Sequence, residues 1–109
     1  MAFGFLYPRY VARRSFDLPP AQLFTAVKLA LNDLHWSYRI LWNKNFEGEI
    51  PTTNWSWHHD FKIRFPAEGV VEVESRSTYQ EILFDFGRNR RNVETFFARV
   101  SSMTPSPGT

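Results

Sequence analysis

The stretch that decides the fold is Asp60–Arg76, DFKIRFPAEGVVEVESR. Apolar and charged residues alternate on both sides of a Pro-Ala-Glu-Gly turn, which is typical of two antiparallel strands with one buried face. Opposed residues share a face, and one register makes every outward pair an opposite-charge pair. The predicted pairs are Phe65–Val71, Ile63–Val73 and Phe61–Ser75 inward, and Arg64–Glu72, Lys62–Glu74 and Asp60–Arg76 outward. Each outward pair adds roughly 0.2–1 kcal/mol, so we expect a solvated, self-paired face rather than a ligand platform.

Alternation predicts further strands before this hairpin. In one of them Tyr38, Ile40 and Trp42 share the inward face. The remaining predicted segments are strands over 9–16, 38–42 and 46–50 and a loop over 51–57.

Two helices are predicted from apolar residues at three- and four-residue steps. The first covers 19–34 and starts at Asp17-Leu-Pro-Pro, where Asp17 is the capping acid and the prolines fit a first turn. Asp85 is the predicted N-cap of the second helix. Their buried stripes are Leu23, Phe24, Val27, Leu31 and Leu34 in the first, and Phe86, Val93, Phe96, Phe97 and Val100 in the second.

The order of elements is therefore β-α-β-β-β-β-α, an α+β fold. It predicts a single antiparallel sheet of about five strands with both helices packed on one face. This matches the arrangement of the TATA-box-binding protein, a reduced form of the helix-grip theme. Such a fold analogy carries no function.

The chain has 109 residues, enough for one domain. We expect an apolar arm over 1–8, one domain over 9–101 and a disordered tail over 102–109. The sequence has no cysteine, which excludes a disulfide scaffold, and it shows neither a signal peptide nor a membrane-spanning stretch. The expected location is the cytoplasm or the periphery of a membrane.

Charge is distributed unevenly along the chain. Residues 1–16 and residues 86–109 each carry a net charge of +3, and the middle carries −4. If the two ends meet in space, they form a basic face, although a solvated surface is the simpler interpretation.

The second half of the sequence resembles the domain-of-unknown-function family 1499. The residues that carry the resemblance are Arg76-Ser77, Asp85-Phe86-Gly87, Asn89, Val93, Phe96-Phe97 and the strand His59–Arg64. His59 stands where the family has an acid, Tyr79 stands where it has a serine, and no glycine lies between Tyr79 and Asp85. The resemblance implies a compact domain of bacteria and plastids without an established enzymatic role, sometimes attached to membrane-bound chains.

The candidate binding residues are aromatic and basic. Trp55, Trp57 and His58 lie in a polar loop, where indole rings either cap the core or contact a partner. Phe3 and Phe5 make the N-terminal arm apolar. The basic candidates are Arg88 and Arg91 at the start of the second helix, where a solvated helix face is the alternative.

Catalytic and metal chemistry find little support in the sequence. His58 and Asp60 have the spacing of two metal ligands, with His35 as a possible third, but Asp60 already has Arg76 opposite it. No nucleophile elbow or converging titratable pair is present, so we predict no catalytic residue, no metal and no cofactor.

The favoured hypothesis is a non-enzymatic interaction module, an accessory subunit that docks on another protein or a membrane-associated assembly. The alternative is a nucleic-acid-binding or small-ligand-binding domain that uses the sheet or the sheet–helix cavity. Nucleic acid is not the expected partner, because acids interrupt the bases on the outward face.

Overall fold

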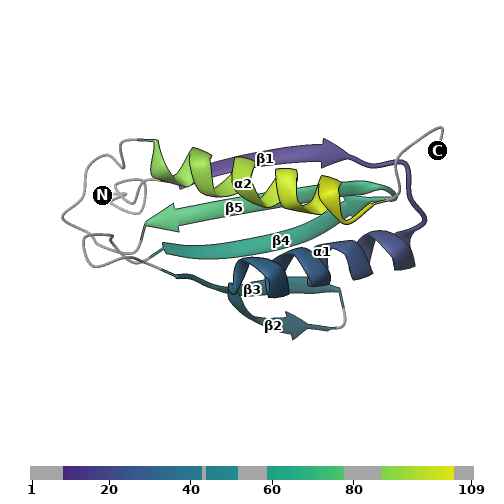
Figure 1. The fold of residues 1–109 in the computed structure, drawn as a ribbon, viewed down its shortest axis with the longest axis horizontal. Helices are drawn as coiled ribbons and strands as arrows, with labels where there is room; N and C mark the ends of the chain where they lie inside the picture. Colours follow the sequence, from purple (N-terminus) through teal and green to yellow (C-terminus); the bar gives the residue numbers. More distant parts are fainter. Residues whose placement is uncertain (1–8, 43, 52–58, 78–86, 105–109) are drawn as a thin grey trace, which may run out of the picture.

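The structure, a computed structural model, describes residues 9–42, 44–51, 59–77 and 87–104. Strands β1–β5 form one antiparallel sheet in the order β1-β5-β4-β3-β2. The helices α1 and α2 both lie on one face of it (Figure 1). The predicted α+β fold is confirmed. The elements are β1 Arg9–Ser15, α1 Pro20–Leu34, β2 Ser37–Leu41, β3 Asn45–Ile50, β4 His59–Ala67, β5 Val70–Ser77 and α2 Arg88–Ser102.

The central hairpin has the predicted register along most of its length. The pairs Ile63–Val73, Phe61–Ser75, Arg64–Glu72, Lys62–Glu74 and Asp60–Arg76 are all observed. The predicted pair Phe65–Val71 is wrong, because the register shifts between Arg64 and Ala67. Pro66 has no backbone N–H to continue the ladder, and an irregularity at this point accommodates it.

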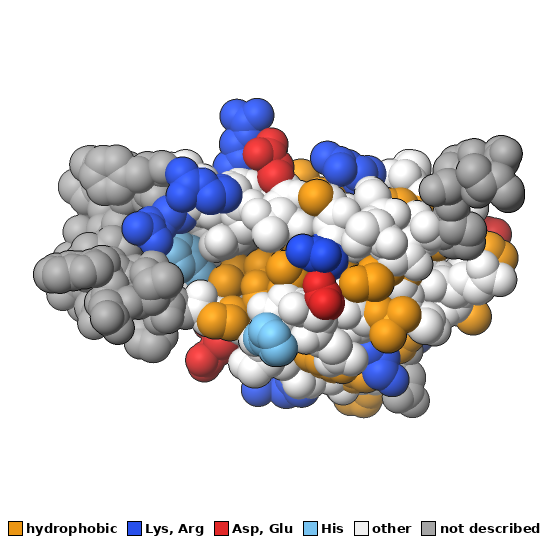
Figure 2. All heavy atoms as spheres, in the orientation of Figure 1, with side chains coloured by type: hydrophobic (Ala, Val, Ile, Leu, Met, Phe, Trp, Pro, Cys, Tyr) orange, Lys and Arg blue, Asp and Glu red, His pale blue; other side chains and the backbone are white. Residues whose placement is uncertain are grey.

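The two basic ends of the chain meet, because β1 pairs with β5 and α2 packs against β1 and β5. The Arg14 guanidinium lies 4.6 Å from the centre of the Phe97 ring, a cation–π contact between the two ends. Positive side chains on the helix side are nevertheless scattered among other residues rather than gathered into one patch (Figure 2).

Aromatic rings fill the core between the helices and the sheet. Phe24 and Phe46 have ring centroids 4.7 Å apart, and Trp36 lies 5.2 Å from Phe61. His35 ends α1 in the left-handed conformation, and the next residue, Trp36, is buried. The chain therefore leaves the helix at His35, and the residue that follows still contributes its side chain to the core.

Both predicted helix caps are wrong. Pro19 is the N-cap of α1, and no side chain caps that helix, so Asp17 does not act as its cap. Gly87 is the N-cap of α2, with a φ of 78° that favours glycine; Asp85 lies two residues earlier and outside the described residues. At its other end α2 extends to Ser102, one residue past the predicted domain boundary.

Candidate docking surface

Most of the predicted site residues lie outside the part that the structure describes: Phe3, Phe5, Trp55, Trp57 and His58. Arg88 and Arg91 are described and lie in the first turn of α2, one step of three residues apart. Arg91 is exposed and Arg88 is half-buried. The structure therefore places Arg88 and Arg91 near each other, and the other five candidate residues stay predictions.

The described residues next to these segments share one end of the sheet. In the strand register, Ile50 lies opposite His59, which lies opposite Ser77, and Arg9 lies opposite Arg76. The start of α2 is fixed at the same end by buried side chains. Ser75 Oγ donates to Asn89 Oδ1 at 2.7 Å, and Asn92 Nδ2 donates to Ser75 Oγ at 3.2 Å.

Of the three residues in the metal hypothesis, the structure describes His35 and Asp60, and His58 lies outside the described residues. Within the described ranges, no group of three or more His, Cys, Asp or Glu side chains could hold a metal ion. His35 lies at the end of α1 on the helix side, and Asp60 points outward from the sheet opposite Arg76. The two therefore do not converge.

The helix-free face of the sheet carries a network of ion pairs. Glu72 accepts hydrogen bonds from Arg13 Nε at 2.8 Å and from Arg64 Nη1 at 2.6 Å. Glu74 contacts Arg64 at 3.2 Å and Arg9 at 3.7 Å. The guanidinium groups thus lie over the two carboxylates, whose side chains are nearly buried.

The electrostatics of Glu72 follow from these contacts. The Arg13 hydrogen bond lowers the pKa of Glu72 below its ordinary value, partial burial acts in the opposite direction, and Arg64 adds to the lowering. Glu72 therefore stays ionised while the network is intact. On the neighbouring pair of strands, Arg39 Nη2 contacts Glu47 at 2.6 Å.

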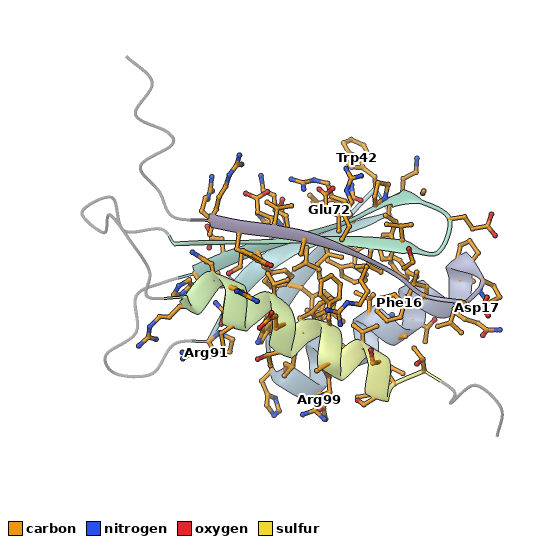
Figure 3. All side chains as sticks on the ribbon, turned by 90° about the horizontal axis from the view of Figure 1, so that it is seen from above. Phe16, Asp17, Trp42, Glu72, Arg91 and Arg99 are labelled. Carbon is orange, nitrogen blue, oxygen red and sulfur yellow. The ribbon has the colours of Figure 1, made fainter. Side chains whose placement is uncertain are left out.

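Trp42 is the prominent apolar residue of this face. It follows the last residue of β2, has a φ of 57° and is 85% exposed. Figure 3 shows Trp42 and Glu72 on the side of the sheet away from α2, with Arg91 and Arg99 on the helix side. We use the term Trp42 surface for the sheet face opposite α1 and α2, which carries Trp42 and the ion pairs Arg39–Glu47 and Arg64–Glu72.

The prediction that Trp42 shares the inward face of a strand with Tyr38 and Ile40 is wrong. The strand ends at Leu41, and Lys44 N donates to Leu41 O at 2.9 Å to close a turn. The sequence predicts a turn near 43–45, because Asn43 and Asn45 flank Lys44 and asparagine favours turns. The observed turn begins earlier, directly after Leu41.

The family called "Protein of unknown function (DUF1499)" matches residues 7–100. The chain belongs to this family. The match covers most of the chain, whereas the resemblance seen in the sequence was carried mainly by its second half. No curated protein matches the chain.

A solved structure, "Crystal structure of Ara h 8.0201", is similar with a TM-score of 0.51 and 11% identity. The similarity covers 89% of this chain and 97% of that chain. At this identity the likeness shows the fold alone. Neither helix in the described ranges is long and apolar enough to cross a membrane.

Proposed function

We propose that this chain is a non-enzymatic interaction module that docks on another protein, as an accessory subunit of a larger or membrane-associated assembly. The observation that carries the proposal is Trp42, a large apolar side chain held 85% exposed on the sheet face that neither α1 nor α2 covers. Tryptophan is enriched among the residues that contribute most to protein interfaces.

The backbone at Trp42 supports the same proposal. A residue other than glycine in the left-handed region costs roughly 1–2 kcal/mol, and Trp42 has a φ of 57°. Because the indole is exposed, its burial contributes little stability to offset this backbone cost. Strained residues of this kind cluster at binding and switch sites, so a contact with a partner accounts for the position.

The ion pairs on the same sheet face as Trp42 are suited to the polar rim of an interface. Arg39 is bound by Glu47 and Arg64 is bound by Glu72, so both guanidinium groups are already ordered. Arginine is enriched in interfaces, and ordered side chains lose less entropy on binding. A partner would place an apolar pocket over the indole and polar groups over these pairs.

The proposal that the chain is not an enzyme is supported by the positions of the groups whose pKa values are shifted. The pKa values of Arg64, Glu72 and Arg90 are shifted, and each of these groups lies in an ion pair near the surface rather than in a cleft. An acid–base centre needs such groups to converge in a cleft.

The test compares capture by two variants with matched exposed apolar residues. Trp42→Ala removes the indole, and Leu29→Ala removes an apolar side chain, 47% exposed, from α1 on the helix side. Each tagged variant is used to capture partners from gently solubilised native cells, membranes included, followed by quantitative mass spectrometry. We expect one stoichiometric protein whose capture falls about tenfold in Trp42→Ala and is unchanged in Leu29→Ala.

Equal capture by both variants would contradict the proposal. Binding to nucleic acid is the alternative outcome. It would appear as co-purifying nucleic acid whose binding falls steeply with salt, whereas an indole in an apolar pocket responds weakly. Loss of capture only in the double variant Arg88→Glu, Arg91→Glu would move the docking surface to α2.

A further inference from the structure

A second surface feature lies at the hairpin end of the molecule, on the helix side of the sheet. It is an open groove of about 570 Å³ between the first turns of α1, the turn from β2 to β3 and the turn from β4 to β5. We propose that this groove binds an uncharged aromatic small molecule. The site is separate from the Trp42 surface, and the inference does not rest on the proposed docking function.

The floor of the groove is apolar and partly aromatic. Leu23 is fully buried, and the half-buried rings of Phe24 and Phe65 lie with centroids 5.8 Å apart. Phe46 supports both rings from below, at 4.7 Å from Phe24 and 6.4 Å from Phe65. A flat ring laid on these two side chains would add offset or edge contacts of the kind aromatic groups prefer.

The walls of the groove come from the first turns of α1 and from the β4–β5 turn. The ladder between β4 and β5 is irregular from Arg64 to Ala67, and Phe16 N donates to Gly69 O at 2.7 Å, which fixes the turn to the chain that enters α1. Its walls are therefore held by backbone contacts. Its volume lies in the range of small-molecule sites, about 300–1,000 Å³.

The charge at the rim selects the class of ligand. Lys44 and Glu68 are the charged residues that line the groove, and both are exposed. In the described part of the chain no ion pair joins them. A charged ligand would be attracted by one and repelled by the other, and the apolar floor would disfavour its charge. An uncharged ring with one polar substituent fits both the floor and the rim.

Three probes with the same ring test the proposal: 2-naphthol, 2-naphthoate and 2-naphthylmethylammonium, which are neutral, anionic and cationic at neutral pH. Each is titrated into the isotope-labelled full chain, and binding is followed by amide shifts in two-dimensional NMR spectra. We expect 2-naphthol to bind tightest, each charged probe to bind several-fold more weakly, and the shifts to centre on the first turn of α1 and residues 65–69.

Substitutions at the rim then assign the site. Ala21→Trp places an indole in the groove from an exposed position, and Ala98→Trp adds the same side chain at an exposed position on α2. We expect about tenfold weaker binding of 2-naphthol in Ala21→Trp and unchanged binding in Ala98→Trp.

Charge variants provide an independent readout. Lys44→Met is expected to move the preference toward the cationic probe and Glu68→Gln toward the anionic probe, and Lys28→Met, on exposed α1 surface, is expected to change neither. Thermal melting of each variant establishes that it is folded. The proposal is overturned if Ala21→Trp binds as the parent does, if the parent prefers a charged probe, or if no probe saturates.

Discussion

Trp42 combines two features that each lower the stability of the fold, an indole that is 85% exposed and a backbone φ of 57°. Within the part of the chain that the structure describes, no hydrogen bond or aromatic contact involves the Trp42 side chain. At the scale of the single residue, Trp42 is therefore expected to lower the stability of the isolated domain while contributing to binding.

Replacement by glycine tests this separation. Trp42→Gly is expected to raise the free energy of unfolding by about 1 kcal/mol, because glycine adopts a positive φ without the Cβ clash. Trp42→Ala keeps the Cβ and is expected to change stability little. Urea unfolding measures both, and a loss of stability in Trp42→Gly would contradict the strain argument.

Glu72 gives a prediction for pH. Its pKa is lowered in the folded protein, so the network contributes stability that is present above the ordinary value of 4.5 and is lost as pH falls through the lower folded value. Glu72→Gln is expected to flatten the stability profile below about pH 4.5 relative to the parent. Thermal melting across this range checks it; an unchanged profile in Glu72→Gln would show that other groups cause the acid sensitivity.

At the scale of the elements, the attachment of α2 depends on a buried polar contact. Ser75 Oγ donates to the buried Asn89 Oδ1 and accepts from Asn92. Ser75→Ala removes that donor and is expected to cost about 1–3 kcal/mol, whereas Ser37→Ala, at an exposed position in β2, is expected to cost little. If chemical denaturation finds both variants equally stable, the contact does not hold the helix on the sheet.

The β2–β3 ribbon depends on Gly48. A Cβ at this position would lie 2.8 Å from Tyr38 Cα and closer still to Ser37 O, both backbone atoms of β2. Gly48→Ala is therefore expected to push β2 off the sheet edge and to destabilise the domain by about 1–3 kcal/mol. Hydrogen exchange should show the loss of protection in 37–41 first; uniform loss across the sheet would argue against a local effect.

The β4–β5 register was predictable because alternation and cross-strand charge are local patterns that a slip would destroy together. The shift after Arg64 was not, since Pro66 was assigned to the turn rather than to β4. The sequence predicted Ser75 as a residue of the inward face. Its hydrogen bond to Asn89 could not be predicted, because it depends on where α2 packs on the sheet.

At the scale of the whole molecule, α1 and α2 lie on one face of the sheet, and within the described ranges the other face is formed by the strands (Figures 1 and 3). The sequence predicted this layering but placed the candidate site elsewhere, at Phe3, Phe5, Trp55, Trp57, His58, Arg88 and Arg91. The Trp42 surface escaped prediction because Trp42 continued the alternation of Tyr38 and Ile40. The end of β2 at Leu41 breaks that alternation.

Site-specific photo-crosslinking tests the central claim most directly, that the helix-free face docks on a protein through Trp42. A photoreactive benzophenone amino acid replaces Trp42 in one variant and Leu29 in another, and both are irradiated in native cells. The account predicts one discrete crosslinked protein from position 42 and none from position 29. No product from position 42, or the same product from both positions, would contradict it.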